Sequence, residues 1–139
     1  MTGTTLDPVS STTPYLRRRA LGVLAAVGAS AATWLVGALF GVNYAVRSPD
    51  QPEVVVNLIP VIVISLGSAL LGWATLALLE RFARHRATTI WFSLAAAVTL
   101  LSFVPLLQVE ATTGAKLALG AMHLVVPAAL IALLPRRGN

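Results

Sequence analysis

One histidine is the strongest candidate for chemistry in this sequence, because it lies deep inside an apolar stretch. His123 follows Ala115, where the last apolar stretch begins, by eight residues, which places it about 12 Å inward along a helix. Ionisable side chains at such depth in a membrane are rare and usually face the interior of a bundle. They can line a transport pathway, or they can link helices by a hydrogen bond. Since the apolar stretches contain no Asp or Glu to partner His123, the structural role is favoured.

Hydroxyl side chains are expected at a similar depth in the other apolar stretches, counting 1.5 Å per residue along each helix. The sequence therefore predicts a mid-membrane polar layer around His123. Its other members are Ser30, Thr33, Ser65, Thr99 and Ser102. The alternative is that these hydroxyls only bind the carbonyls four residues earlier in their own helices.

Three prolines fall inside apolar stretches, at Pro60, Pro105 and Pro127. A proline lacks the backbone N–H that would bind the carbonyl four residues earlier, and it usually bends a helix. Pro127 frees the carbonyl of His123 in this way. We therefore predict kinks at all three prolines, with gating hinges as the alternative to ordinary bends that neighbouring groups stabilise.

Charged and aromatic residues mark the ends of the apolar stretches. Glu80 and Arg84 have i,i+4 spacing, which predicts an ion pair at the membrane interface. Arg81 and Trp91 are expected at the same interface.

Four apolar stretches are each long enough to cross a membrane as a helix, at about residues 20–41, 54–79, 90–109 and 115–134. The first would extend about 33 Å, against a hydrocarbon core of about 30 Å. Hydrophobic residues make up 57% of the chain and charged residues only 11%, too few charges for the surface of a soluble protein. Short connections favour antiparallel neighbours. The sequence predicts an all-α polytopic membrane protein, a four-transmembrane-helix up-down bundle.

The bundle is predicted to form a single domain over residues 20–134. Residues 1–19 are expected to be a disordered basic tail, and residues 135–139 a short second tail. An export signal cleaved near Ala29-Ser30-Ala31 is the alternative for the first stretch. It is disfavoured because the apolar run continues to Gly41, beyond the usual length of a signal core.

The distribution of basic residues predicts the orientation. Arg47 and Lys116 lie on one side of the membrane. Eight arginines lie on the other side: Arg17, Arg18, Arg19, Arg81, Arg84, Arg86, Arg136 and Arg137. Both termini are therefore predicted to be cytoplasmic, in a multi-pass protein of the cytoplasmic membrane.

Composition and motifs restrict the partners and the chemistry. The net charge of +5 arises from residues at the ends of apolar runs, which face lipid headgroups, so we predict a lipid bilayer partner and no nucleic acid. The chain has no cysteine and shows no phosphate loop, metal motif or paired catalytic carboxylates, so we predict no cofactor and no enzyme activity. Gly37 and Gly41 form a GxxxG pair, which allows a homo-oligomer, a membrane-protein partner or packing within the chain.

Two stretches carry a resemblance to a known family. They are GWATLALLERFARHRATTIW, from Gly72 to Trp91, and ALGAMHLVVPAALI, from Ala118 to Ile131. Together they resemble a family of small, uncharacterised four-helix membrane proteins of actinobacteria, family 6069 among the domains of unknown function. The resemblance implies four spans and assigns no activity, and it directs attention to Glu80, Arg81, Trp91 and His123.

The sequence thus favours a non-enzymatic structural or interaction subunit of the membrane. The alternative is a small transporter or channel-like protein with a polar site around His123.

Overall fold

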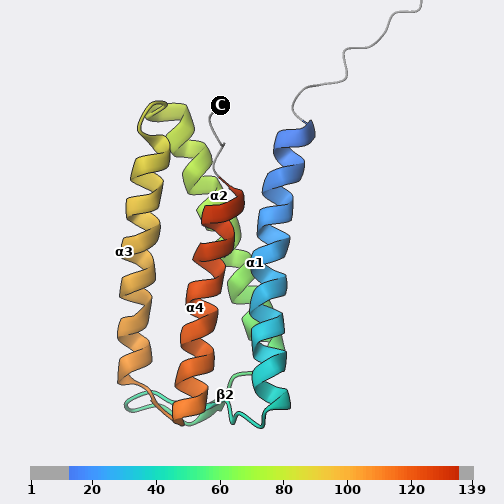
Figure 1. The fold of residues 1–139 in the computed structure, drawn as a ribbon. Coiled ribbons are helices and arrows are strands. Elements are labelled where there is room, and N and C mark those ends of the chain that lie inside the picture. The colour runs from blue at the N-terminus through green and yellow to red at the C-terminus, as the bar shows by residue number, and fades with distance from the viewer. Residues whose placement is uncertain (1–12, 135–139) are drawn as a thin grey trace, which may run out of the picture.

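The computed structural model describes residues 13–134, and four long helices make up most of this part of the chain (Figure 1). They are α1 (Thr13–Leu39), α2 (Leu58–Phe82), α3 (Ala87–Gln108) and α4 (Thr113–Leu133). Each is long and apolar enough to cross a membrane. The predicted all-α, up-down bundle of four spans is therefore confirmed. The tails predicted over residues 1–12 and 135–139 lie outside the described residues.

The helices form a ring in which each neighbour in sequence is a neighbour in space. α1 packs against α2 and α4, and α3 packs against the same two helices, so α1 and α3 lie diagonally opposite. The beginning of α1, the α2–α3 connection and the end of α4 meet at one end of the bundle (Figure 1). We call it the arginine end, because Arg17, Arg18, Arg19, Arg81, Arg84 and Arg86 lie there.

The first helix begins at Thr13, before the predicted boundary at Ala20. Its 27 residues correspond to about 40 Å, longer than a hydrocarbon core of about 30 Å. The prediction that residues 13–19 belong to a disordered tail is therefore wrong. The added turns are held by Arg19, which is buried against α2.

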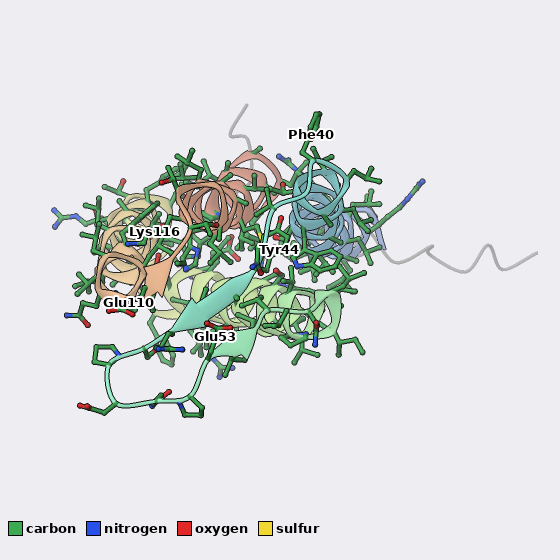
Figure 2. The ribbon with its side chains drawn as sticks, turned by 90° about the horizontal axis from the view of Figure 1, so that it is seen from below. Phe40, Tyr44, Glu53, Glu110 and Lys116 are labelled. Atoms are coloured by element: carbon green, nitrogen blue, oxygen red, sulfur yellow. The ribbon has the colours of Figure 1, made fainter. Side chains whose placement is uncertain are left out.

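The opposite end, which we call the sheet end, carries a small antiparallel sheet that the sequence did not predict. Its strands are β1 (Ala45–Arg47), β2 (Val54–Val55) and β3 (Glu110–Ala111), in the order β2-β1-β3. The valines of β2 pair with β1, so the second span begins at Leu58 and not at Val54. Figure 2 shows the sheet across this end, with Tyr44 at its inner edge and Phe40 pointing outward.

Gly37 lies in the last turn of the first helix and Gly41 just beyond it, and both serve contacts within the chain. Gly41 has a φ of +76°, and its N–H binds the carbonyl of Ala38 at 3.0 Å. The N–H of Val42 binds the carbonyl of Gly37 at 2.9 Å. Together these bonds form a Schellman motif, which satisfies carbonyls that a helix end leaves free. The tyrosine hydroxyl of Tyr44 occupies the space where Gly37 lacks a side chain.

Tyr44 and Trp34 fasten the sheet end to the helices. Their rings stack at 5.4 Å, and the Tyr44 hydroxyl donates to the carbonyl of Trp34 at 3.0 Å. Burial raises the pKa of Tyr44 above its usual value, which keeps the hydroxyl protonated as a donor. The indole of Trp34 donates to the carbonyl of Val56 at 2.9 Å.

Only two of the three prolines are interior to the described helices. Pro105 lies inside α3 and Pro127 inside α4. Pro60 is the third residue of α2, where a backbone N–H has no partner within the helix, so proline is tolerated. The predicted kink at Pro60 is therefore wrong.

A substitution at Gly37 should test the contact with Tyr44. Gly37→Ala places a methyl group where the tyrosine hydroxyl lies, and displacing the ring costs a hydrogen bond and a stacked contact, about 2 kcal/mol together. Gly28→Ala is the matched control, since its added carbon meets nothing within 4 Å and alanine favours the helix by about 1 kcal/mol. Thermal unfolding in detergent should rank Gly37→Ala well below Gly28→Ala, and equal stability would contradict the contact.

Candidate functional site

A cavity of about 490 Å³ lies between α2, α3 and α4 and is open to the surface of the bundle, where its lining residues Ile64, Leu71 and Val98 are exposed. Its volume falls within the range of about 300–1,000 Å³ typical of sites for small molecules. The lining is mostly apolar, and α1 contributes none of the described residues that form it. The polar side chains that line it are Ser65, Ser68, Thr75, Thr99, Ser102 and His123.

The structure brings together most of the predicted polar layer. His123 from α4, Ser65 from α2, and Thr99 and Ser102 from α3 all line the cavity. The predicted contribution of the first helix is wrong, because neither Ser30 nor Thr33 lines it. The layer therefore combines three helices, since α1 lies diagonally opposite α3.

The two hydroxyls of α1 have other environments. Ser30 is fully buried, and within the described part of the chain its hydroxyl has no hydrogen-bond partner. Thr33 donates to the carbonyl of Ala29 at 2.8 Å, one turn earlier in the same helix. Both therefore belong to the packing of α1.

The hydrogen bond of His123 fixes the role of each ring nitrogen. Nδ1 lies 2.7 Å from the carbonyl oxygen of Leu119, and since a carbonyl only accepts, Nδ1 carries the proton. In the neutral ring Nε2 is then an acceptor. The ring of Phe103 packs beside the imidazole at 5.9 Å between centroids. Among the described residues, no hydrogen-bond partner is found for Nε2.

The hydroxyls of α3 line the cavity and also bind carbonyls of their own helix, so both predicted roles apply to them. Thr99 donates to the carbonyl of Ala95 at 2.6 Å, and Ser102 donates to the carbonyl of Thr99 at 2.6 Å. These are the local bonds that hydroxyls commonly form in membrane helices. Because each proton is used within the helix, each oxygen is left as an acceptor at the cavity wall.

Ser68 and Thr75 also line the cavity, and the sequence did not lead us to predict them as members of the polar layer. The sequence nevertheless contains a pattern that indicates their position. On α2 the cavity is lined by Ser65, Ser68, Gly72 and Thr75, small or hydroxylated residues at spacings of three, four and three. Such spacing places residues on one face of a helix. A search for small polar residues at this spacing would have found the wall.

Trp91 is the fifth residue of α3, near the arginine end, and its side chain packs inside the bundle. The residue is only 3% exposed, and its indole N–H donates to the carbonyl of Gly72 at 3.0 Å. It joins α3 to α2 and lines the cavity toward the arginine end. A buried tryptophan of this kind needs such a partner for its N–H.

An ion pair between a buried arginine and a partly exposed glutamate joins α1 and α2 at the arginine end. Nη2 of Arg19 lies 2.7 Å from both carboxylate oxygens of Glu80, and the Tyr15 hydroxyl donates to the same carboxylate at 2.8 Å. The guanidinium also lies 4.1 Å above the Tyr15 ring. Arg19 is 1% exposed, so this is a fully desolvated cation with a charged partner.

The predicted pair of Glu80 with Arg84 is therefore wrong. α2 ends at Phe82, so Arg84 does not keep the i,i+4 geometry of a continuous helix. Arg81 and Arg84 are exposed at the arginine end, where headgroups would meet them. From the sequence, Arg19 was interpreted only as one member of a basic cluster. No local pattern predicted that it pairs with Glu80.

A second ion pair of the described chain lies at the sheet end. Arg47 and Glu53 are 3.6 Å apart and more than half exposed, and Figure 2 shows Glu53 beside the small sheet. Among the described residues, no group of three or more His, Cys, Asp or Glu side chains could hold a metal ion.

The model of a family of unknown function, DUF6069, matches residues 10–139, nearly the whole chain. No curated protein and no solved structure matches significantly.

Removing one partner of the ion pair between Arg19 and Glu80 should destabilise the bundle. Glu80→Gln leaves Arg19 buried without a counter-charge, which costs about 3 kcal/mol in comparable pairs. Arg81→Gln is the control, an exposed arginine one residue away, and should cost less than about 1 kcal/mol. Chemical unfolding in detergent would measure both.

The double variant Arg19→Met with Glu80→Leu provides a second check. Replacing both charges by apolar groups of similar size is often neutral, so this protein should recover most of the stability lost in Glu80→Gln. If Glu80→Gln were as stable as Arg81→Gln, the pair would not hold the helices together.

Proposed function

The chain belongs to DUF6069, a family of unknown function, so we propose a function from the geometry of the bundle itself. The protein is a four-span membrane protein of this family. We propose that it binds a lipophilic small molecule in the cavity between α2, α3 and α4, without catalysing a reaction. The cavity of about 490 Å³ with its polar belt is the observation that carries the proposal.

The character of the cavity supports binding. An apolar wall with a few convergent polar groups is the usual composition of a small-molecule site. The walls near Trp91, Val126 and Leu130 are apolar, whereas His123 and Ser65 supply polar groups at mid-depth. A molecule dissolved in the bilayer could exchange with such a site from the lipid.

The positions of the carboxylates support a non-enzymatic role. Glu80 is occupied by Arg19 and Tyr15 at the arginine end. Glu53 pairs with Arg47 at the sheet end. A carboxylate that worked with His123 as an acid–base pair would have to lie within hydrogen-bond reach of it, and Glu80 and Glu53 are held at the two ends of the bundle.

The distribution of charge supports an orientation with the arginine end in the cytoplasm. Six arginines lie at this end in the described chain, against Arg47 and Lys116 near the sheet end. Arg19 is neutralised by Glu80, yet the difference remains in the direction of the positive-inside rule. Both termini would then lie in the cytoplasm of a cell whose plasma membrane holds the protein.

An interaction subunit is the second candidate, and the weak packing of α3 favours it. Ala87 and Trp91 are the buried residues of this helix, so most of its surface faces outward. A homo-oligomer through Gly37 and Gly41 is less favoured. Gly37 is covered by Tyr44, and Gly41 lies past the end of α1 in the turn.

Filling the cavity should abolish binding. Ala95 lines the cavity, whereas Ala96 is its exposed neighbour on α3, so Ala95→Phe and Ala96→Phe form a matched pair. Native mass spectrometry of protein in nanodiscs made directly from cell membranes should detect a bound small molecule on wild type and Ala96→Phe. Ala95→Phe should lack it.

Two results would go against the proposal. The same bound mass on all three proteins would place the molecule outside the cavity. A polypeptide partner on all three, with no small molecule on any, would favour the subunit.

A further inference from the structure

Most of the polar side chains of the cavity lie in a narrow range of depth, and Thr75 is the exception. Counted from the sheet-end terminus of each helix, Ser65 lies about 10 Å inward, Thr99 about 14 Å and His123 about 15 Å. Toward the arginine end the lining continues through Pro127, Trp91 and Leu130 and is apolar except for Thr75. A ligand that fits this wall has a long apolar body and a polar group near one end.

The belt offers more acceptors than donors. Nδ1 of His123 is used by the carbonyl of Leu119, so Nε2 accepts in the neutral ring. The protons of Thr99 and Ser102 are used by carbonyls of α3, which leaves their oxygens as acceptors.

The serine hydroxyls of α2 can supply the hydrogen-bond donors that the rest of the belt lacks. Ser65 is 6% exposed, and within the described chain neither Ser65 nor Ser68 has a hydrogen-bond partner. A serine hydroxyl can rotate to donate or to accept. Both can therefore donate to a ligand oxygen whose own proton goes to the histidine.

We infer that the cavity binds a lipophilic alcohol or phenol, whose hydroxyl donates to Nε2 of His123. The apolar body of the ligand extends toward Trp91 and Leu130. This inference rests on the proposed binding function and adds the chemical class of the ligand. The reason is that hydrogen-bond acceptors without donors lie at one depth of the cavity. A purely apolar ligand would leave these acceptors without a hydrogen bond.

A pair of probes, of which only one carries a hydrogen-bond donor, tests the class. Para-dodecylphenol can donate a hydrogen bond, whereas its methyl ether, para-dodecylanisole, cannot. Binding is measured to protein in nanodiscs of zwitterionic lipid, corrected for partition into nanodiscs without protein. Wild type should bind the phenol roughly fivefold more tightly than the ether, as one hydrogen bond of about 1 kcal/mol implies.

Two histidine variants test whether the preference for the phenol over the ether depends on Nε2 of His123. His123→Phe keeps a ring and removes the acceptor, so its preference for the phenol should fall to about onefold by the loss of that bond. His85→Phe, which changes the exposed histidine of the α2–α3 connection, should keep the preference. Melting temperatures of both variants control for folding, and the comparison of probes on wild type does not depend on either variant.

The outcomes separate this inference from the function on which it rests. Equal binding of both probes by wild type would overturn the alcohol or phenol class and leave a cavity that binds apolar molecules. A preference that survives in His123→Phe would overturn the role of Nε2. Binding of neither probe would overturn the inference together with the proposed function.

Discussion

Hydrocarbon offers no hydrogen-bond partner to a backbone, and this constraint governs how each segment of the chain is arranged. Within the spans, the backbone N–H and C=O groups bind one another along each helix. At the helix ends, other groups of the chain bind the N–H and C=O groups that the helix leaves free. The turn at Gly41 returns two N–H groups to carbonyls of α1, and Thr112 accepts from the N–H of Ala115 at the start of α4. The sheet pairs the backbone of the connections at that end.

Hydrogen bonds and ion pairs between segments also correspond to how closely the helices pack. At one end Arg19 of α1 pairs with Glu80 of α2, and at the other Trp34 of α1 donates to the carbonyl of Val56, just before α2. Together with α4 it forms a closely packed unit, whose buried core includes Ala26 and Leu130. α3 is joined to α2 by the indole of Trp91 and buries little else. The space between α3 and its neighbours is therefore where a cavity remains.

The four spans could be predicted from the sequence because hydrophobic length is a local property. Depth counting also placed His123 level with Ser65, Thr99 and Ser102, which the cavity brings together, but it could not give direction, so Ser30 and Thr33 were wrongly included. Arg19 and Glu80 are 61 residues apart, and no local spacing identifies such a pair. The three short strands depend on pairing between distant connections, and the cavity depends on how side chains of three helices fit.

The most direct test of this account measures where the described helices meet water. The chain has no cysteine, so single cysteines can be introduced by Gln51→Cys in the hairpin, Arg84→Cys at the arginine end and Leu100→Cys on the outer face of α3. A thiol reagent that cannot cross membranes should label the first in intact cells, the second only after the membrane is opened, and Leu100→Cys in neither case. Labelling of Arg84→Cys in intact cells would contradict the orientation, and ready labelling of Leu100→Cys would contradict the membrane-spanning bundle itself.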